Sequence, residues 1–240
     1  MIVERSGEVP ASQPSAEPQA APPGQDPSTW IRPKPAYDAL SRMVDLIVAG
    51  LILVLLSPLW LAIAVLIRTT SPGPALFRRT VVGRRGRSFT YYKFRSMVEG
   101  DDSHHRRWLR DFVTKDAPYR AGGAYKVVDD TRITPMGRWL RRLSLDEVPQ
   151  LINVVRGEMS IVGPRPPILE EYQLYDTRAR RRLAVRPGIT GLYQVTARSR
   201  VPFSEMLAID LDYIERRSLR LDVVIMLRTL GVMLSGRGAG

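Results

Sequence analysis

Two adjacent acids, Asp146 and Glu147, are the residues of this chain whose types and spacing most clearly suggest chemistry. Three arginines precede them within eight residues, at positions 138, 141 and 142. A carboxylate can bind Mg²⁺ or act as a nucleophile, and an arginine can hold phosphate oxygens in a bidentate manner. The alternative is an acidic helix start balanced by surface arginines, which is the usual role of an isolated acidic pair.

Further cations lie in short stretches with little backbone freedom. They are Lys93, Arg95, Arg165 and Arg186, and Arg165 stands between Pro164 and Pro166. Cations gathered around two carboxylates suit a substrate that carries phosphate groups together with Mg²⁺. This context favours a magnesium–phosphate site over a plain acidic helix start.

The acids lie between two predicted helices. Met136, Leu140 and Leu143 recur at helical spacing and predict the first helix. The second is expected from Glu147 to Arg156, closed by a glycine at position 157.

The start of the second helix has two alternatives. If Asp146 is the N-cap, Pro149 falls in the first turn, where its missing N–H costs nothing. If Ser144 is the N-cap and Glu147 completes a capping box, Pro149 lies deeper and a hydrogen bond is lost. Both alternatives place the acids at the positive end of a helix, which favours ionised carboxylates and attracts phosphate.

An uncharged run of 22 residues, Leu46 to Ile67, must position this site relative to a membrane. As a straight helix it would be about 33 Å long, enough to cross the hydrocarbon core. Ser57-Pro58 interrupts it at the middle, and basic residues, which favour the cytoplasmic side, flank both ends. We therefore expect a re-entrant helix that breaks at Ser57-Pro58 and returns to the side it entered, with the Ser57 hydroxyl satisfying a freed carbonyl.

The uncharged run also has to be weighed as a different kind of helix. A kinked helix that crosses completely is about equally compatible with the pattern. A buried core helix is disfavoured, because such a long apolar run would need covering on every side. The position of the run, with 45 residues before it, excludes a cleaved signal peptide.

Composition narrows the partners. The net charge of +12 beside a membrane segment favours anionic headgroups or phosphorylated substrates. Nucleic acid is not an expected partner, because few aromatic residues interleave with the basic stretch 178–186 and no recognition-helix or zinc motif is present. The chain has no cysteine, which excludes disulfides and thiolate chemistry and fits a cytosolic face.

The remaining pattern predicts a mostly helical α+β fold. Residues 1–35 are Pro- and Ala-rich and are expected to form a disordered tail, followed by a membrane helix over 36–68, a cytosolic catalytic domain over 69–237 and a tail over 238–240. Within the domain we expect a β-hairpin (75–82 and 88–94), a basic helix (168–184), a loop and strand (186–200), and a helix over 219–234 that lies in the membrane interface or packs on the domain. A metal site at His104-His105 is disfavoured, because adjacent histidines in a charged stretch are usually solvated.

The sequence resembles the monotopic phosphoglycosyl transferases, also called the bacterial sugar transferase family, from about Tyr37 to Arg237. The resemblance rests on motifs in a fixed order: the run broken at Ser57-Pro58, Tyr92-Lys93-Phe94-Arg95-Ser96-Met97, Leu143-Ser144-Leu145-Asp146-Glu147 with Gln150-Leu151, Arg156-Gly157-Glu158-Met159-Ser160, Gly163-Pro164-Arg165-Pro166, Arg186-Pro187-Gly188-Ile189-Thr190-Gly191 and Leu221-Asp222. Each motif is weak alone, whereas the ordered set is specific.

The resemblance implies a mechanism and a location. Asp146 would attack the β-phosphorus of a nucleotide diphosphate sugar, and a polyprenyl phosphate would then take the phosphosugar from the carboxylate. Glu147 is expected to hold Mg²⁺ with Asp146 or to assist deprotonation of the carrier. Arg141 and Arg165 match phosphate-binding positions of the family, and the basic residues at 93, 95 and 186 fall in matching motifs. The expected setting is the cytoplasmic face of a bacterial inner membrane.

Two segments depart from the family pattern. Phe77-Arg78-Arg79 stands where many relatives carry a glutamine, and Leu192-Tyr193-Gln194-Val195 replaces a version with tryptophan. Both touch regions that could shape the choice of sugar or nucleotide, which the sequence does not identify. From another functional class, the alternative is a non-catalytic membrane-surface adaptor that binds anionic lipid or a partner protein and uses the acids only as helix caps.

Overall fold

The computed structural model describes residues 30–98, 100, 103–116, 131–197 and 201–234. Most of the predicted N-terminal tail and the predicted tail over 238–240 lie outside these residues. The described part is mostly helical and holds two small sheets, antiparallel β1–β2 and parallel β3–β4. This confirms the mostly helical α+β class with a small hairpin, and adds a parallel pair that the sequence did not predict.

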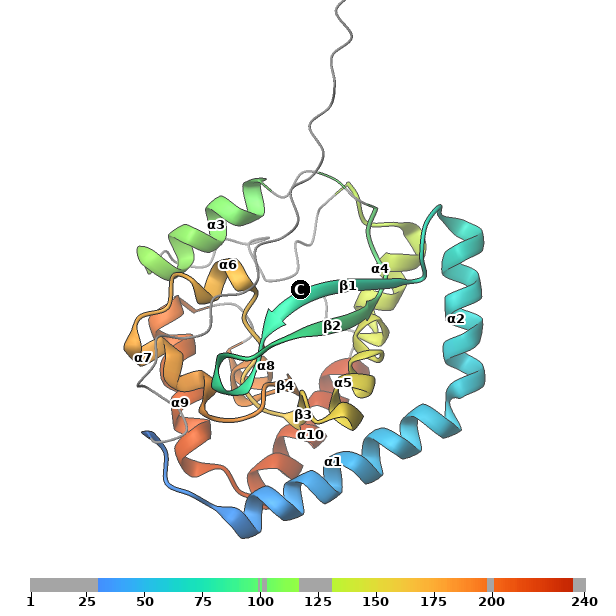
Figure 1. Cartoon of the computed structure of the whole chain (residues 1–240). Coiled ribbons are helices and arrows are strands. Elements are labelled where there is room, and N and C mark those ends of the chain that lie inside the picture. The colour runs from blue at the N-terminus through green and yellow to red at the C-terminus, as the bar shows by residue number, and fades with distance from the viewer. Residues whose placement is uncertain (1–29, 99, 101–102, 117–130, 198–200, 235–240) are drawn as a thin grey trace, which may run out of the picture.

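Two helices, α1 (Pro35–Leu55) and α2 (Ser57–Thr70), run along two sides of the domain (Figure 1) and meet at a bend of 63°. Pro58 has no N–H to give to the Val54 carbonyl four residues earlier, and the Ser57 hydroxyl donates to that carbonyl at 2.8 Å. The predicted break and its local remedy are therefore confirmed. In the part of the chain that the structure describes, no single helix is long and apolar enough to cross a bilayer, whereas this bent pair passes that test of length and composition.

The bent pair is apolar on both of its faces, and only one face is covered. Ala49, Ile63 and Ile67 are buried against the domain. The opposite face exposes large apolar side chains along its whole length: Leu46, Ile47, Leu51, Val54, Leu55, Leu56, Leu59, Leu61, Val65 and Leu66. A soluble monomer rarely exposes a contiguous apolar surface of this extent.

Polar contacts fasten α1 to the domain. The Asp45 carboxylate accepts hydrogen bonds from the Ser160 hydroxyl at 3.0 Å and from the Ile161 N–H at 2.9 Å. Arg42 donates to the carbonyls of residues 154 and 155, at 2.6 and 3.0 Å. Both side chains therefore bind the domain across the interface, because the helix lies directly on it.

The beginning of α1 is also held by the domain. Tyr37 and Tyr213 each donate a hydrogen bond to the buried Asp222 carboxylate, at 2.8 and 2.9 Å. Lys34 donates to the carbonyls of Glu215 and Arg217, at 2.9 and 3.0 Å. Residues 30–35, which were predicted to be part of the tail, therefore belong to the folded unit.

The hairpin at the centre of Figure 1 consists of β1 (Leu76–Val82) and β2 (Ser88–Phe94), joined through a short turn over Arg84–Gly86. It agrees with the prediction to within one residue. The register places Phe77 opposite Lys93 and Val82 opposite Ser88. Because side chains alternate along a strand, the odd-numbered residues from 77 to 81 share a face with Lys93.

The helices around the hairpin begin with α3 (Ser103–Thr114), in a charged stretch for which the sequence predicted no helix. Next come α4 (Pro135–Arg142), the 3₁₀ turn η3 (Leu145–Glu147) and α5 (Gln150–Arg156). Gly157 closes α5 with φ of 81°, as its position predicted.

The predicted basic helix over 168–184 is wrong, because three short pieces replace it: α6 (Leu169–Tyr172), α7 (Thr177–Arg180) and η4 (Arg181–Ala184). The Asp176 side chain accepts from the Ala179 N–H at 2.7 Å and starts a new helix within that stretch. The strands β3 (Ser160–Val162) and β4 (Gly188–Thr190) pair in parallel.

The chain continues through α8 (Leu192–Thr196), α9 (Phe203–Arg216) and α10 (Leu219–Leu234). The last helix has the predicted bounds. It buries Ile225 while it exposes Val223, Val224, Leu227 and Leu230. One face of α10 therefore packs on the domain, as one alternative predicted. The other alternative, a position in the membrane interface, stays a prediction.

Candidate active site

The acidic pair lies in a tight turn between α4 and α5. Ser144, just after α4, has φ of 55°, a left-handed conformation that few residues other than glycine adopt. It precedes η3 but makes no side-chain cap hydrogen bond, and Asp146 lies inside η3, so neither predicted N-cap forms. Backbone strain of this kind is concentrated at functional sites.

The two acids differ in exposure. Asp146 is 2 % exposed. The Glu147 side chain is 20 % exposed and forms an ion pair with Lys93, at 3.1 Å between Oε1 and Nζ. Lys93 lies near the end of β2 and also stands over the Tyr91 ring, 5.3 Å from its centroid. The hairpin therefore places one of the predicted cations directly against the acidic pair.

Arg141 occupies the last turn of α4, five residues before Asp146. Its guanidinium is buried and lies against the Met97 sulfur, at 3.1 Å from Nη1. Met97 ends the motif that contains Lys93, so the contact brings two of the sequence motifs together.

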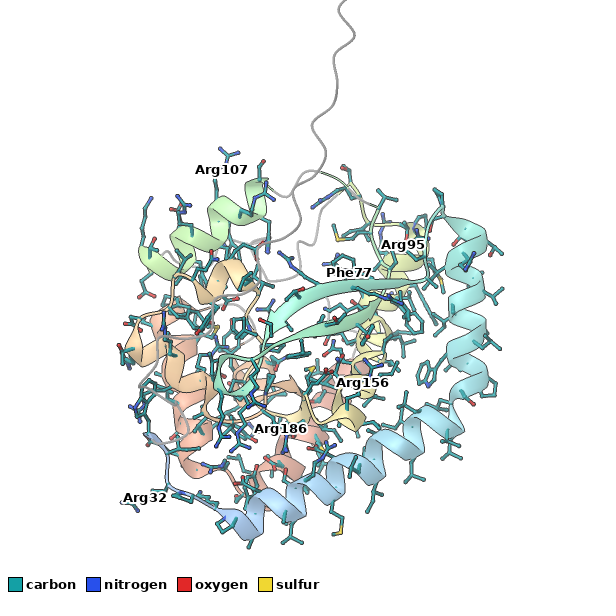
Figure 2. All side chains as sticks on the ribbon, viewed as in Figure 1. Arg32, Phe77, Arg95, Arg107, Arg156 and Arg186 are labelled. Atoms are coloured by element: carbon teal, nitrogen blue, oxygen red, sulfur yellow. The ribbon has the colours of Figure 1, made fainter. Side chains whose placement is uncertain are left out.

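Arg95 is engaged at the end of α2. Its Nη2 donates to the Ser71 carbonyl at 2.8 Å and to the Ser71 hydroxyl at 2.9 Å, and Nη1 donates to the Pro72 carbonyl. Figure 2 shows Arg95 beside α2. Gly73 has φ of 109°, a conformation that L side chains rarely adopt, which accounts for the glycine there. The arrangement caps and anchors α2. Arg95 does not contact the acidic pair in the described residues, so its predicted phosphate role has no support from the structure.

Arg165 belongs to a buried network. Its Nη1 donates to Glu171 at 3.4 Å, and its own carbonyl accepts from Arg182 at 3.2 Å. Arg182 also pairs with Asp210 at 2.8 Å. Tyr175 bonds both Glu171 and Arg182. The Arg165 side chain is about one-quarter exposed, so part of it still faces solvent.

Arg186 lies at the other end of α5 from the acids. Its Nε donates to the Gly157 carbonyl at 3.0 Å, just after α5 ends, whereas the acids come just before α5 begins. The helix between them has 7 residues, which corresponds to about 10 Å. Figure 2 places Arg186 near the α1 side of the domain. Of the five predicted cations, Lys93 contacts the acidic pair and Arg141 precedes it in α4. Arg95 and Arg186 make structural contacts, and Arg165 joins the buried network with its side chain partly exposed.

Two adjacent carboxylates suit the way proteins hold Mg²⁺, which commonly takes one or two carboxylates and completes its shell with substrate phosphates and water. Among the described residues, no cluster of three or more His, Asp or Glu could enclose a metal ion. Asp101 and Asp102 beside the histidine pair lie outside the described residues, and His105 stacks on Trp108. Among the described residues, Asp146 and Glu147 are adjacent carboxylates that could hold Mg²⁺ together with a substrate.

Two buried polar groups were not predicted from the sequence. One is Asn153, which is fully buried and joins α5 to β2. The other is the Glu171–Arg182–Asp210 network. The sequence held a hint of both, because Asn153 and Asp210 are polar residues among apolar neighbours in Leu151–Val155 and in Phe203–Ile214. The structure shows that both are buried. Their partners are distant in the chain and could not be read from spacing.

Comparison with known proteins agrees with the motif order. Residues 36–236 match the family model of the bacterial sugar transferases. The exopolysaccharide production protein ExoY of Rhizobium meliloti is 38% identical over 206 residues, which cover 86% of this chain and 90% of that protein.

Two relatives carry more specific names. The UDP-glucose:undecaprenyl-phosphate glucose-1-phosphate transferase of Caulobacter vibrioides is 38% identical over 211 residues, covering 85% of this chain and 73% of that protein. The undecaprenyl-phosphate galactose phosphotransferase of Salmonella typhimurium is 37% identical over 202 residues, covering 83% and 41%. With its family model matched over most of its length, the chain belongs to the bacterial sugar transferase family.

Proposed function

We propose that this protein transfers a phosphosugar from a nucleotide diphosphate sugar to undecaprenyl or another polyprenyl phosphate, through a covalent intermediate on Asp146. Relatives of similar sequence are named as undecaprenyl-phosphate sugar phosphotransferases, two of them with UDP-sugar donors. The observation that carries the proposal is the turn between α4 and α5, where a buried aspartate stands next to an ion-paired glutamate. A non-catalytic adaptor has no need for a strained turn at this point.

The chemistry follows in two displacements. An Asp146 carboxylate oxygen forms a bond to the β-phosphorus of the donor, and the bond from that phosphorus to the oxygen of the leaving nucleoside monophosphate breaks. A phosphate oxygen of the polyprenyl carrier then attacks the same phosphorus, and the bond to the Asp146 oxygen breaks. The carboxylate is restored, and the product is a polyprenyl diphosphate sugar.

The neighbouring residues offset charge. Bound Mg²⁺ would reduce the repulsion between a carboxylate and a pyrophosphate and stabilise charge on the leaving group. Glu147 is held by Lys93, in a position next to the nucleophile where it can share the metal or accept a proton from the carrier phosphate. Arg141, in the last turn of α4, and the solvent-facing part of Arg165 are the proposed phosphate ligands.

The bent pair supplies the membrane anchor of the proposal. Its first residues contact α9 and α10 through Lys34 and Tyr37, and its last residues are tied to Arg95. Both ends therefore meet the same charged domain, which cannot enter hydrocarbon. This supports a re-entrant, monotopic arrangement on the cytoplasmic face, with the uncovered apolar side chains in lipid, rather than a full crossing.

The activity is tested with the purified full chain in detergent. Nucleotide diphosphate sugars are incubated with Mg²⁺ and undecaprenyl phosphate, and release of the nucleoside monophosphate is measured. With the carrier present, one donor of the panel should be turned over many times. Without the carrier, each enzyme molecule should consume one donor and gain one phosphosugar on the peptide containing Asp146. The absence of release with every donor of the panel would refute the proposal.

Topology is tested by labelling. The chain has no cysteine, so single cysteines at Gly7 and Thr114 can be probed with a membrane-impermeant maleimide. Both should be protected in intact cells and react after permeabilisation. If only one is protected, the pair crosses the membrane.

A further inference from the structure

Asn153, in the middle of α5, makes three hydrogen bonds although none of its surface is exposed. Its Nδ2 donates to the Thr90 carbonyl at 2.7 Å and to Glu158 at 2.6 Å. Its Oδ1 accepts from the Tyr92 N–H at 3.3 Å. The carboxamide is oriented by these partners, because the flipped orientation would bring an NH₂ group against an N–H.

Two of these bonds go to the backbone of β2. In a two-stranded sheet each strand leaves one edge without a strand partner, and buried backbone groups there must find partners elsewhere. Asn153 takes the place of a third strand at residues 90 and 92. The match to one N–H and one C=O, two residues apart, fixes the position of α5 along β2.

The Lys93–Glu147 ion pair joins the same two parts of the chain. Lys93 directly follows Tyr92 on β2, and Glu147 lies six residues before Asn153 at the approach to α5. Their ion pair and the Asn153 bridge are thus two links between the same parts of the chain. A slip of one residue along β2 is a shift of about 3.3 Å, enough to break a salt bridge of normal length.

We infer that Asn153 is a positioning residue for the transfer reaction, which sets the Lys93–Glu147 geometry by docking α5 on the edge of β2. The inference rests on the proposed function. Asn153 touches no substrate and acts through the ion pair that it aligns. Because the bridge is internal to the α5–β2 contact, its loss should disturb turnover more than donor binding.

The main experiment is a double-mutant cycle with Asn153→Ala and Lys93→Met, in which kcat and the KM for the donor are measured per folded molecule. In the otherwise unchanged enzyme, Asn153→Ala should lower kcat by about tenfold or more while KM changes less than about threefold. In the Lys93→Met enzyme, the same substitution should cost less than about threefold, because the pair that Asn153 aligns is already lost. Equal losses in both backgrounds would overturn the inference.

A matched control removes another polar link between the same elements. The Tyr92 hydroxyl accepts from Arg156 at 2.9 Å on the exposed side of the contact. Tyr92→Phe should leave kcat within about twofold, since the buried bridge remains. A loss in Tyr92→Phe as large as that in Asn153→Ala would mean that general loosening of α5 accounts for both, and would overturn the inference.

A second variant guards against misfolding. In Asn153→Asp combined with Glu158→Gln, an oxygen at position 153 still accepts from the Tyr92 N–H, and the side chain at position 158 can donate to position 153. The hydrogen bond to the Thr90 carbonyl is therefore the one lost. Its kcat should fall in the same direction, and full kcat would contradict the inference.

Hydrogen exchange at the Tyr92 amide gives a readout besides activity. Exchange should be faster in Asn153→Ala than in the unchanged enzyme. Faster exchange with unchanged kcat would overturn the positioning role while the proposed function stands. An unchanged enzyme that turns over no donor would instead refute the proposed function.

Discussion

The Lys93–Glu147 pair and the Glu171–Arg182–Asp210 network both join cations to carboxylates, yet they differ in their exposure to water. The first pair has side chains 23 % and 20 % exposed. In the second, Arg182 is 1 % exposed, and its partners are 0 % and 3 % exposed. The same residue types therefore serve two purposes, according to whether another charged molecule can reach them.

In the buried network each charge is satisfied within the protein. Arg182 contacts two carboxylates and the Arg165 carbonyl, and Tyr175 completes the set. Burial raises the pKa of Asp210, and the neighbouring Arg182 counteracts part of that rise. Such a network holds the Arg165 loop against α6 and α9. In the proposed reaction, the partly exposed Lys93–Glu147 pair would exchange partners with a substrate phosphate.

The largest effect is expected at Asp146, the proposed nucleophile. Asp146→Asn keeps the shape of the side chain but replaces the proposed nucleophilic carboxylate by a neutral amide, so transfer should fall by about 10⁴-fold or more. The covalent phosphosugar should be absent when the variant is incubated with donor alone, as measured by intact-protein mass. Activity near that of the unchanged enzyme would exclude Asp146 as the nucleophile.

Removing the cation of each group sharpens the comparison. Arg182→Met removes the arginine that two buried carboxylates share, although Glu171 keeps Arg165, and we expect a loss of about 3–5 kcal/mol in the free energy of unfolding. Lys93→Met removes a partly exposed pair and should change that free energy by less than about 1 kcal/mol, while it lowers turnover. Denaturant unfolding in detergent measures the free energy of unfolding of both variants. Similar losses of stability would show that the two groups do not differ in the way proposed.

Asp222, a buried acid outside both groups, tests the effect of burial through the pH dependence of stability. Burial raises the pKa of Asp222, and the hydrogen bonds from Tyr37 and Tyr213 oppose that rise. The native state therefore keeps this proton at pH values where the unfolded chain has lost it, so stability from this group declines as pH rises from about 4 through its raised pKa. The stability of the unchanged protein minus that of Asp222→Asn should thus decrease over that range and then level off. Melting temperatures measured across it check the sign, and a difference that grows with pH would contradict it.

Several features could be predicted because their causes are local. Pro58 removes one hydrogen bond wherever the helix lies, and Ser57 is next to the carbonyl that loses it. Gly157 closes α5 because a left-handed residue is needed there. The hairpin and α10 follow from short-range apolar patterns, and the motif order sufficed to indicate the family and the acidic pair.

The tertiary structure decided which charges accompany that pair. Arg95 caps α2 and Arg186 meets the end of α5, although the sequence placed both, like Lys93, in matching motifs of the family. A long side chain takes the partners that folding brings within about 3–4 Å. For Arg95 and Arg186 those partners lie 24 and 29 residues away in the chain. Spacing along one segment therefore identified the nucleophile candidate, while packing between segments selected its neighbours and made Asn153 the link between them.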